Sequence, residues 1–463
     1  MPGKRISQIE TELQKFLKKH PDTGVIELLI ADVTGALRGK RIRNNDFAKT
    51  FKNGFYMPGA AVLLDTIGGD IKGSPWSSTD GDPDVNAIVV PGSLTPIPWA
   101  QKPSAQVMFR FFTHDGEPFL ADSRHVLERA AEPVRKMGLK IVMAIELEFY
   151  LLDGKADKPT ARVSKVPGIG RVQPGPQVFS PDDLWDIETF LNDLNETCDA
   201  QGIPAGTTTS EFSPGQFEIN LQHVDDPVLA CDQGVLLKRA IKAIARKHGL
   251  VACFMAKPFE EDAGSGMHVH MSLVDRNGKN YFSQGKQNMA SPPFSSRLRH
   301  SVGGLAKIMA ESTAIFAPNA NSFRRLRPDM QAPVEPNWGA NHRTVALRIP
   351  MSDEKNLRFE HRVPGADANP YLVTAAILAG VHYGLKNKCD PGRMVQVHEV
   401  IEPVLKIPNR WDAAIDLFSR SKILPQYLGE DFCKIYAMHR RDESRQFHNA
   451  VSTLDFDWYM RAV

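Results

Sequence analysis

Paired acidic residues in the segment IVMAIELEFYLL are the first candidates for chemistry. Glu146 and Glu148 lie two residues apart within an otherwise apolar run. In a β-strand such residues point to the same face, so the two carboxylates would project side by side. Adjacent carboxylates repel each other, so one must be protonated or both must bind a cation. A strand whose polar face meets water would give the same pattern.

A second acidic pair occurs in SEFSPGQFEINL, where Glu211 and Glu218 flank a Ser213-Pro214-Gly215 turn. We expect this turn to bend the chain and bring both carboxylates to one site. The alternative is that the two are solvated acids at the edge of a loop.

Two histidines follow a glycine-rich turn in GSGMHVHMSL. His268 and His270 would share one face of a strand. A single core histidine usually has a structural role, whereas two on one strand face fit ligand binding as well as they fit packing.

Arginine residues surround a further carboxylate. In NLRFEHRVPGADANPY, Arg358, Glu360 and Arg362 fall on one strand face, which favours a site for an anion and a metal. The segments NSFRRLRPD and NHRTVALRIP supply more arginines, namely Arg324, Arg325, Arg327, Arg343 and Arg348. Any one of them alone would fit a surface ion pair.

The combined set of side chains indicates a particular chemistry. Oxygen-dominated ligands with an imidazole suit the hard ions Mg²⁺ or Mn²⁺ better than zinc. Arginines beside such ions suit phosphate and carboxylate groups, so the set is typical of metal-dependent phosphoryl transfer. The sequence contains no GxxxxGK[ST] loop and no protein-kinase signature, which disfavours those two folds.

The chain around these motifs predicts a mixture of strands and helices. The stretches 66–105 and 153–180 are rich in Gly and Pro and are expected to form loops, although Trp76 and Trp99 argue against disorder in the first. The mixture indicates an α+β or α/β fold with a small domain over 1–115 and a larger one over 116–463. Helices are predicted over 5–20, 123–137, 181–201, 227–248, 369–386 and 434–461, and strands over 25–32, 36–42, 140–152, 251–257 and 267–274.

Composition excludes several classes of protein. The formal net charge of the 463 residues is only +2, which gives no support for nucleic-acid binding. The five cysteines form no CxxC pair, which is typical of reduced thiols in a cytosolic protein. No apolar run is long enough for a membrane span, and the first 20 residues lack the apolar core of a signal peptide. We therefore expect a cytoplasmic protein that has no membrane partner.

Six segments, in this order, resemble the glutamine synthetase family: ELEFYLLD, EFSPGQFEINL, GSGMHVHMSL, NSFRRLRP, NHRTVALRIP and RFEHRVPGADANPYL. The resemblance covers nearly the whole chain. It implies an α+β fold with a small N-terminal β-grasp-like domain and a large catalytic domain that binds ATP and glutamate. It also implies a homo-oligomer of six-membered rings stacked as a dodecamer, with each active site at the seam between neighbouring subunits.

The resemblance carries roles over to individual positions. Two or three Mg²⁺ or Mn²⁺ ions are expected per site, and ATP is the co-substrate. The family mechanism forms γ-glutamyl phosphate, which an amine then attacks. The metal ligands would be Glu146, Glu148, Glu211, Glu218, His268 and Glu360. Glutamate contacts would come from Gly264, His268, Arg325, Arg343 and Arg362, the three arginines also being catalytic, and ATP contacts from Ser272, Arg348 and Arg358.

Departures from the family pattern concern ammonium. The family has a glutamate before an Ala-Pro pair and an N-terminal aspartate that reaches the neighbouring subunit's site; here these positions are Gln331 and Pro58. Because ammonium needs close carboxylates for capture and deprotonation, their joint loss favours a larger organic amine. This pattern resembles the γ-glutamylpolyamine and γ-glutamylamine synthetase branch, as does the C-terminal DFDWYMRAV. A third departure, Ala263 in place of an asparagine, affects one expected glutamate contact.

The amine itself is not specified by the sequence. Aromatic and acidic residues suit organic ammonium groups, and the candidates are Glu335 and Trp338 beside Gln331, and Trp76, Asp80, Asp82 and Asp84 in the N-terminal domain. Two other functions stay open: a genuine glutamine synthetase that uses ammonia, and a catalytically silent assembly or regulatory protein of the same fold. Retention of all six matched metal ligands favours an active ligase in polyamine catabolism or nitrogen metabolism.

Overall fold

The computed structural model describes residues 2–71, 73–154, 159–166, 168–172, 177–284, 294–328 and 330–463. Its first sheet has the order β2-β1-β6-β4-β3, with β5 beside β6. Strands β1 and β6 run parallel, and the other pairs are antiparallel. The strands are β1 (Val25–Ala31), β2 (Leu37–Arg43), β3 (Phe55–Pro58), β4 (Asp84–Val89), β5 (Thr95–Pro96) and β6 (Ser104–Phe112); the helices of this part are α1 (Pro2–Lys19), α2 (Asn44–Asn53) and the 3-10 helix η1 (Gly59–Val62).

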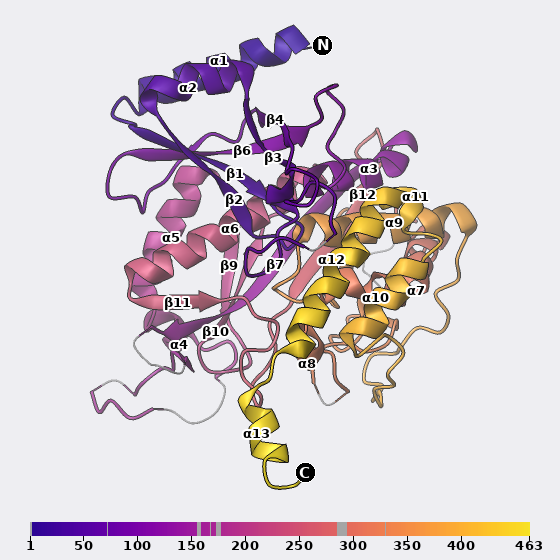
Figure 1. Ribbon diagram of the computed structural model, residues 1–463. Helices are drawn as coiled ribbons and strands as arrows, with labels where there is room; N and C mark the ends of the chain where they lie inside the picture. The colour runs from indigo at the N-terminus through magenta and orange to yellow at the C-terminus, as the bar shows by residue number, and fades with distance from the viewer. Residues whose placement is uncertain are drawn as a thin grey trace.

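A larger sheet follows, with the order β13-β14-β15-β12-β7-β10-β9 and with β8 and β11 also paired to β7. The long strand β7 lies at its centre (Figure 1), and most of its side chains are buried because apolar residues surround Glu146 and Glu148. The strands are β7 (Lys140–Asp153), β8 (Thr160–Ala161), β9 (Ala205–Ser210), β10 (Gln216–Leu221), β11 (Leu250–Cys253), β12 (Met267–Val274), β13 (Trp338–Ala340), β14 (Leu347–Ile349) and β15 (Phe359–His361).

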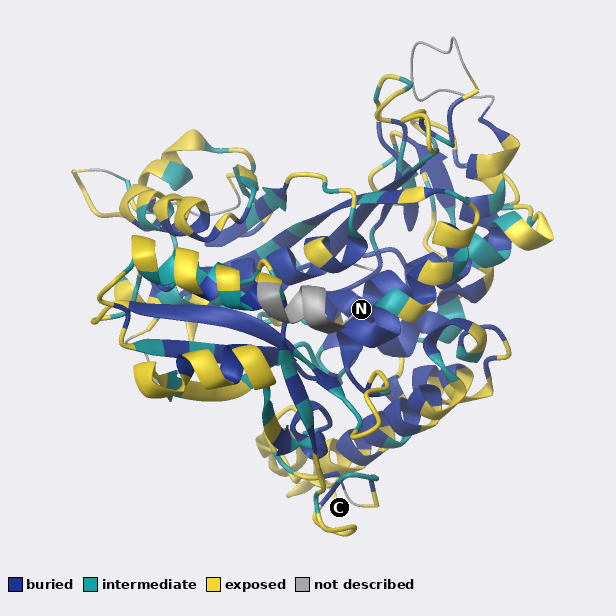
Figure 2. Cartoon of the chain, turned by 90° about the horizontal axis from the view of Figure 1, so that it is seen from above, coloured by how far each residue is buried: buried dark blue, intermediate teal, exposed yellow. Residues whose placement is uncertain are grey.

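Helices cover the larger sheet and extend its core. Figure 2 shows buried residues along the inner sides of the helices and exposed residues on their outer sides. These helices are α3 (Ser123–Lys136), α4 (Pro181–Trp185), α5 (Glu188–Gln201), α6 (Pro227–Lys247), α7 (Ser296–Phe316), α8 (Ser322–Arg325), α9 (Pro370–Asn387), α10 (Trp411–Arg420), α11 (Pro425–Leu428), α12 (Glu430–Asn449) and α13 (Thr453–Tyr459).

Local sequence explains where three of these helices begin. The Asp122, Asp226 and Asn369 side chains each accept a hydrogen bond from a backbone N–H of the first helical turn of α3, α6 and α9. In α6 and α9 a proline follows the cap, where its missing N–H costs no hydrogen bond. These caps fix where the three helices begin.

The predicted α+β class is confirmed, with two separate sheets, and most predicted elements occur within two residues of their expected ends. Two predicted helices were wrong in length: 181–201 divides into α4 and α5, and 434–461 belongs to α12 and α13. The strand predicted over 251–257 ends at Cys253. The prediction that 66–105 is a loop was also wrong, because β4, β5 and the start of β6 lie there. The predicted domain boundary near residue 115 falls between β6 and α3.

No helix in the described part of the chain is both long and apolar enough to span a membrane.

Candidate active site

Strand pairing explains how the acidic segments meet. On one side of β7, Glu148 lies opposite Glu218 of β10. On its other side, Glu146 lies opposite His268 of β12. Because partners in adjacent strands share a face of the sheet, the predicted carboxylates and the histidine gather at one place.

His268 is surrounded by carboxylates. Its Nδ1 lies 3.3 Å from Oε2 of Glu146, 3.8 Å from Oε1 of Glu360 and 4.0 Å from Oε2 of Glu218. Its Nε2 lies 3.7 Å from Oε1 of Glu148. Four of the predicted metal ligands are thus within 4.0 Å of the fifth.

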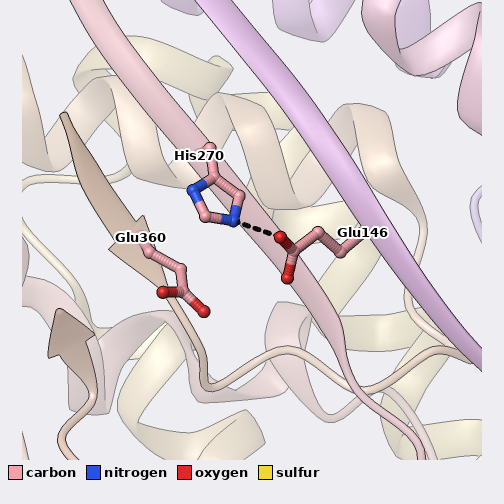
Figure 3. Close-up of side chains that lie close together, drawn as sticks. All are labelled: Glu146, His270 and Glu360. Carbon is pink, nitrogen blue, oxygen red and sulfur yellow. Dashed lines mark hydrogen bonds and ion pairs between the residues drawn. The ribbon is translucent and has the colours of Figure 1, made fainter. Parts of the chain in front are cut away.

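His270 belongs to the same cluster, although the resemblance assigned it no role. Its Nε2 lies 2.7 Å from Oε1 of Glu146, and the Nε–H of Arg358 donates to its Nδ1 over 3.1 Å. Since that arginine nitrogen can only donate, Nδ1 accepts and Nε2 carries the proton toward Glu146. In Figure 3, His270, Glu146 and Glu360 come from three strands and face the same space. The spacing of two residues from His268 was the signal for this position.

Two carboxylates of the cluster are difficult to ionise. Burial, with the Glu146 and Glu148 charges beside it, raises the pKa of Glu218 to about 10. Burial and the Glu148 charge also raise the pKa of Glu211 to about 7. Glu211 follows β9, and the turn predicted at Ser213-Pro214-Gly215 joins it to β10; its N–H donates to the carbonyl of Gln216 over 2.8 Å.

The other side of the cluster is already neutralised by cations. Arg348 Nη1 donates to Oε2 of Glu360 over 2.7 Å, and Arg362 bonds to Oε1 of the same carboxylate. Burial disfavours the charge of Glu360, but Arg362 and then His270 and His268 outweigh it and lower its pKa to about 2. Burial likewise opposes ionisation of Glu146, yet His270 and His268 hold its pKa well below its usual value.

The donor atoms of the cluster fit divalent cations. Two sets each have ligand atoms within 4.8 Å of one another, namely Glu146, His270 and Glu360, and Glu146, Glu218 and His268. Carboxylate oxygens with imidazole nitrogens suit Mg²⁺ or Mn²⁺. The pKa values of Glu211 and Glu218 stay raised because burial and the neighbouring carboxylates outweigh the charges of Arg343 and Arg362. A bound cation would lower the cost of ionising both.

The glycine-rich turn before β12 is held against this cluster by hydrogen bonds. Gly266 N–H donates to Oε2 of Glu148 over 2.6 Å, and the Gln216 amide donates to the Gly264 carbonyl over 3.1 Å. A Cβ on Gly264 would lie 2.7 Å from the Ala256 carbonyl oxygen and 2.8 Å from Cγ of Arg325. Only glycine therefore fits between these two neighbours. At the departure Ala263, the N–H donates to Ser213 and the carbonyl accepts from Tyr150.

The predicted glutamate-binding arginines differ in their surroundings. Arg325 is buried, and its guanidinium donates to the carbonyls of Val363 and Arg362. Arg343 is exposed, and its charge acts on Glu211. Arg362 lies on the Glu360 side of the cluster. Arg325 thus positions the chain at the turn, whereas Arg343 acts on Glu211 from an exposed position.

The predicted ATP contacts lie toward one side of the cluster. Arg348 reaches it through Glu360, and Arg358 reaches it through His270. Ser272 is two residues beyond His270 on the same strand and is buried. All three positions therefore lie on the Glu360 side of the site. Ser272 is on β12, Arg348 is on β14, and Arg358 directly precedes β15.

The candidates for amine recognition differ in their exposure and in the contacts that they make. Gln331 is exposed and Pro58 half-buried. Trp338 is only 2% exposed, and its indole N–H donates to the Gly392 carbonyl over 3.3 Å. Glu335 is buried, with Oε2 2.9 Å from the Lys406 ammonium and Oε1 accepting from Asn337. Trp338 and Glu335 are therefore already occupied by contacts within the chain.

The N-terminal candidates also make internal contacts. The Asp80 carboxylate accepts from the N–H groups of Trp76 and Ser77. The Trp76 ring packs edge-on against Phe119 with centroids 4.9 Å apart. Burial, with Asp70 and its acidic neighbours, raises the pKa of Asp82, while Asp84 is exposed on β4.

Two exposed phenylalanines beside Glu211 were missed by the sequence reasoning. Phe212 directly follows Glu211 and is 48% exposed. Phe179 is 67% exposed, has the left-handed φ of +62°, and its N–H donates to the carbonyl of Ser210 over 3.0 Å. A strained backbone that leaves an aromatic ring in solvent is typical of functional positions. The adjacency of Phe212 to Glu211 was the only sequence signal.

The clustered carboxylates and imidazoles, with arginines beside them, have the donor atoms that could hold a divalent cation. The model of the glutamine synthetase catalytic domain matches residues 120–459. The chain is 39% identical to gamma-glutamylputrescine synthetase of Escherichia coli strain K12, over 99% of this chain and 96% of that protein. The chain belongs to the glutamine synthetase family.

Two further comparisons agree with this assignment. Glutamate–isopropylamine ligase of a Pseudomonas species is 31% identical, over 98% of both chains. The ligand-free structure of GmaS superposes with a TM-score of 0.82 at 25% identity, over 98% of this chain and all of that one. The fold is therefore shared along nearly the full length of both chains.

Proposed function

We propose that this protein is an ATP-dependent ligase that joins the side-chain carboxylate of glutamate to an organic amine. The observation that carries the proposal is the cluster of carboxylates around His268, in which Arg348 and Arg362 pair with Glu360. That arrangement matches a substrate set of anionic phosphates, an anionic amino acid and an amine. The two similar ligases named above, for putrescine and isopropylamine, support an organic amine as the nucleophile.

The reaction would proceed in two steps. An oxygen of the glutamate side-chain carboxylate attacks the γ-phosphorus of ATP, the bond to ADP breaks, and γ-glutamyl phosphate forms. The amine nitrogen then attacks the acyl carbon and loses a proton, and the C–O bond to phosphate breaks. Bound divalent ions supply positive charge to the phosphate oxygens during the transfer.

Side chains of this protein would have distinct roles in these steps. Glu146, Glu148 and Glu218, with Glu211, Glu360 and His268, would hold the cations. His270, whose Nε2–H faces Glu146 and whose Nδ1 accepts from Arg358, would orient the Glu146 carboxylate. Arg358 and Arg348 would bind ATP phosphates, and Ser272 lies further along the same strand. Arg343 and Arg362 would bind glutamate and the transferring phosphoryl group, beside the turn that Gly264 and Arg325 shape.

The amine would bind near Glu211. Phe212 and Phe179 expose aromatic rings there, and such rings attract organic ammonium groups and pack on alkyl chains. Neutral residues at Gln331 and Pro58 would make the site less able to concentrate ammonium. Of the two further functions considered, ammonia-dependent glutamine synthesis conflicts with these neutral positions. A catalytically silent protein of the same fold would have no need to retain all six predicted cation ligands.

Assembly in stacked six-membered rings and a cytoplasmic location stay predictions. In such rings the loop around Pro58 would approach the site of the neighbouring subunit. The choice between Mg²⁺ and Mn²⁺ and the number of ions are likewise open to measurement.

The experiment that tests the proposal traces the transfer of an oxygen atom from the glutamate side chain to phosphate. Glutamate carrying ¹⁸O in its side-chain carboxylate is incubated with ATP, Mg²⁺ and putrescine, and the products are analysed by mass spectrometry. We expect γ-glutamylputrescine and one ¹⁸O in the released phosphate, because that oxygen bridges carbon and phosphorus in the intermediate. Unlabelled phosphate would exclude the acyl phosphate, and the Glu360→Ala variant should form no product.

A further inference from the structure

A cavity lies where α6 faces the N-terminal sheet. It has a volume of about 460 Å³ and is formed by the β1–β2 turn, the loop before β6 and one face of α6. This volume is within the range of small-molecule sites. Its walls are Gly35–Leu37, Trp99, Val235, Lys238, Arg239, Lys242, Ala243 and Arg246. None of these residues takes part in the candidate active site.

All four ionisable side chains in the wall of this cavity are cations. Lys238, Arg239, Lys242 and Arg246 come from about two turns of one helix. A concave wall that carries charges of one sign concentrates ions of the opposite sign. The cavity is therefore suited to an anion.

Two of the cations are already satisfied by the chain. Arg239 bonds to Glu27 and donates to the Gln106 side chain over 2.9 Å, and its guanidinium stacks over Trp99 at 5.5 Å. Lys238 donates to the carbonyls of Ala366 and Ala368. These contacts hold Trp99 and the Lys238 ammonium in the wall.

The surroundings of Lys242 and Arg246 differ from those of Lys238 and Arg239. Both are exposed, and neither makes an ion pair with an acidic side chain in the described part of the chain. The ammonium groups of Lys238 and Lys242 each lie 5.5 Å from the Phe254 ring centroid. Burial and the nearby Lys242 charge lower the pKa of Lys238 to about 7, so the two ammonium groups repel each other. An anion between them would relieve this repulsion.

We propose that this cavity binds a small molecule with two or more carboxylate or phosphate groups through Lys242 and Arg246. Trp99 and Leu37 would contact the apolar part of that ligand. Because the cavity joins the N-terminal sheet to α6, the bound anion would link the two parts of the subunit. It would thereby stabilise the protein against unfolding.

The test uses citrate and inorganic pyrophosphate as probes in titration calorimetry, without divalent metal and at constant ionic strength. The Lys242→Gln/Arg246→Gln double variant removes the two free cations. Arg135→Gln/Lys136→Gln on α3 removes the same charge elsewhere and is the matched control. Thermal unfolding without probe verifies that each variant is folded.

We expect saturable binding of at least one probe to the wild type, with a Kd raised about tenfold or more in the α6 variant and unchanged in the control. The probe that binds distinguishes a carboxylate ligand from a phosphate ligand. Binding of neither probe at millimolar concentration would overturn the proposal. Equal weakening in both double variants, or none in the α6 variant, would do so too. Because no ATP, glutamate or amine is present, the result is independent of ligase activity.

Discussion

Glu360 and Glu218 lie on either side of the same histidine, yet their surroundings are opposite. Glu360 is held by Arg348 and Arg362, and its pKa is lowered to about 2. Glu218 faces the carboxylates of Glu146 and Glu148, and its pKa is raised to about 10. One side of the site is neutralised by direct ion pairs with arginine, whereas Glu218 has no ion pair with arginine or lysine among the described residues.

This difference separates two kinds of buried carboxylate. A carboxylate paired with arginine contributes to stability whether or not a ligand is present. A carboxylate among like charges opposes folding when ionised and is useful only when a cation binds. Replacement of each kind should therefore have different consequences.

The largest effect is expected from Glu360→Gln. The variant loses a cation ligand and leaves Arg348 and Arg362 without their carboxylate. Turnover should fall on the order of 10³-fold, and the free energy of unfolding should fall by about 3 kcal/mol even without metal. Phosphate release and urea unfolding measure the two quantities. Turnover like that of the wild type would refute the assignment of this residue.

Glu218→Gln should instead spare the metal-free protein. Because its pKa is about 10, the carboxyl group carries a proton at neutral pH, and an amide of similar shape replaces it at little cost. The midpoint of thermal unfolding without metal should shift by less than about 2 °C. Saturating Mn²⁺ stabilises a protein by about 2.7 kcal/mol at 100 times its Kd, and this gain should be largely lost. A variant that Mn²⁺ stabilises as well as the wild type would contradict the account.

Glu443 on α12 provides a paired carboxylate without catalytic chemistry. It accepts two hydrogen bonds of 2.7 Å from Thr66 and lies 2.7 Å from Nη1 of Arg440. Burial opposes its charge, but Arg440 and His439 lower its pKa from 4.5 to about 2. Its stabilisation is therefore present above pH 4.5 and is lost as the pH falls toward 2.

We expect Glu443→Gln to lower the free energy of unfolding by about 2 kcal/mol at pH 7 and to flatten its decline between pH 4.5 and 2. Stabilisation by Mn²⁺ should be unchanged. Denaturant unfolding over this pH range measures both effects. An unaltered pH profile would mean that Glu443 is not the group responsible.

The turn that contacts both sides of the site can be tested with Gly264→Ala. The new methyl group would meet the Ala256 carbonyl and the Arg325 side chain. We expect a loss of about 1–3 kcal/mol in stability and a rise in the KM for glutamate. Gly24→Ala is the control, because a Cβ there has no neighbour within 4 Å. Equal behaviour of the two variants would show that the turn tolerates a side chain.

The smallest effect is expected from Gln331→Glu. A carboxylate at this exposed position would attract ammonium, so the ratio of ammonium to organic-amine turnover should rise, by about tenfold at most. Parallel kinetics with the two nucleophiles measure this ratio. An unchanged ratio would show that Gln331 does not contribute to the choice between ammonium and an organic amine.

Sequence patterns predicted the parts of this site that depend on strand periodicity. Glu146, Glu148, His268 and Glu360 share a face because their strands pair, and spacing by two residues already indicated this. Other features of the site depend on contacts between residues that are far apart in the sequence, and these required the structure. Trp338 is an aromatic residue near Gln331 in sequence, yet it is buried. Phe179 precedes Glu211 by more than thirty residues, and hydrogen bonds to Ser210 bring their segments together.

The helix predictions failed for a related reason. Hydrophobic spacing continues through residues 434–461, but the chain bends between α12 and α13 after Asn449. Likewise, the Gly and Pro content of 66–105 concealed β4, whose place in the sheet depends on β3 and β6 rather than on its own composition.

The most direct test of the account is phosphate release from ATP with Mg²⁺ and glutamate against ammonium, putrescine, spermidine and isopropylamine. The account predicts turnover with at least one organic amine and at least tenfold less with ammonium at equal concentration. Strong turnover with ammonium would make the protein a glutamine synthetase and would contradict the interpretation of Pro58 and Gln331. No turnover with any nucleophile would contradict the proposed ligase activity itself.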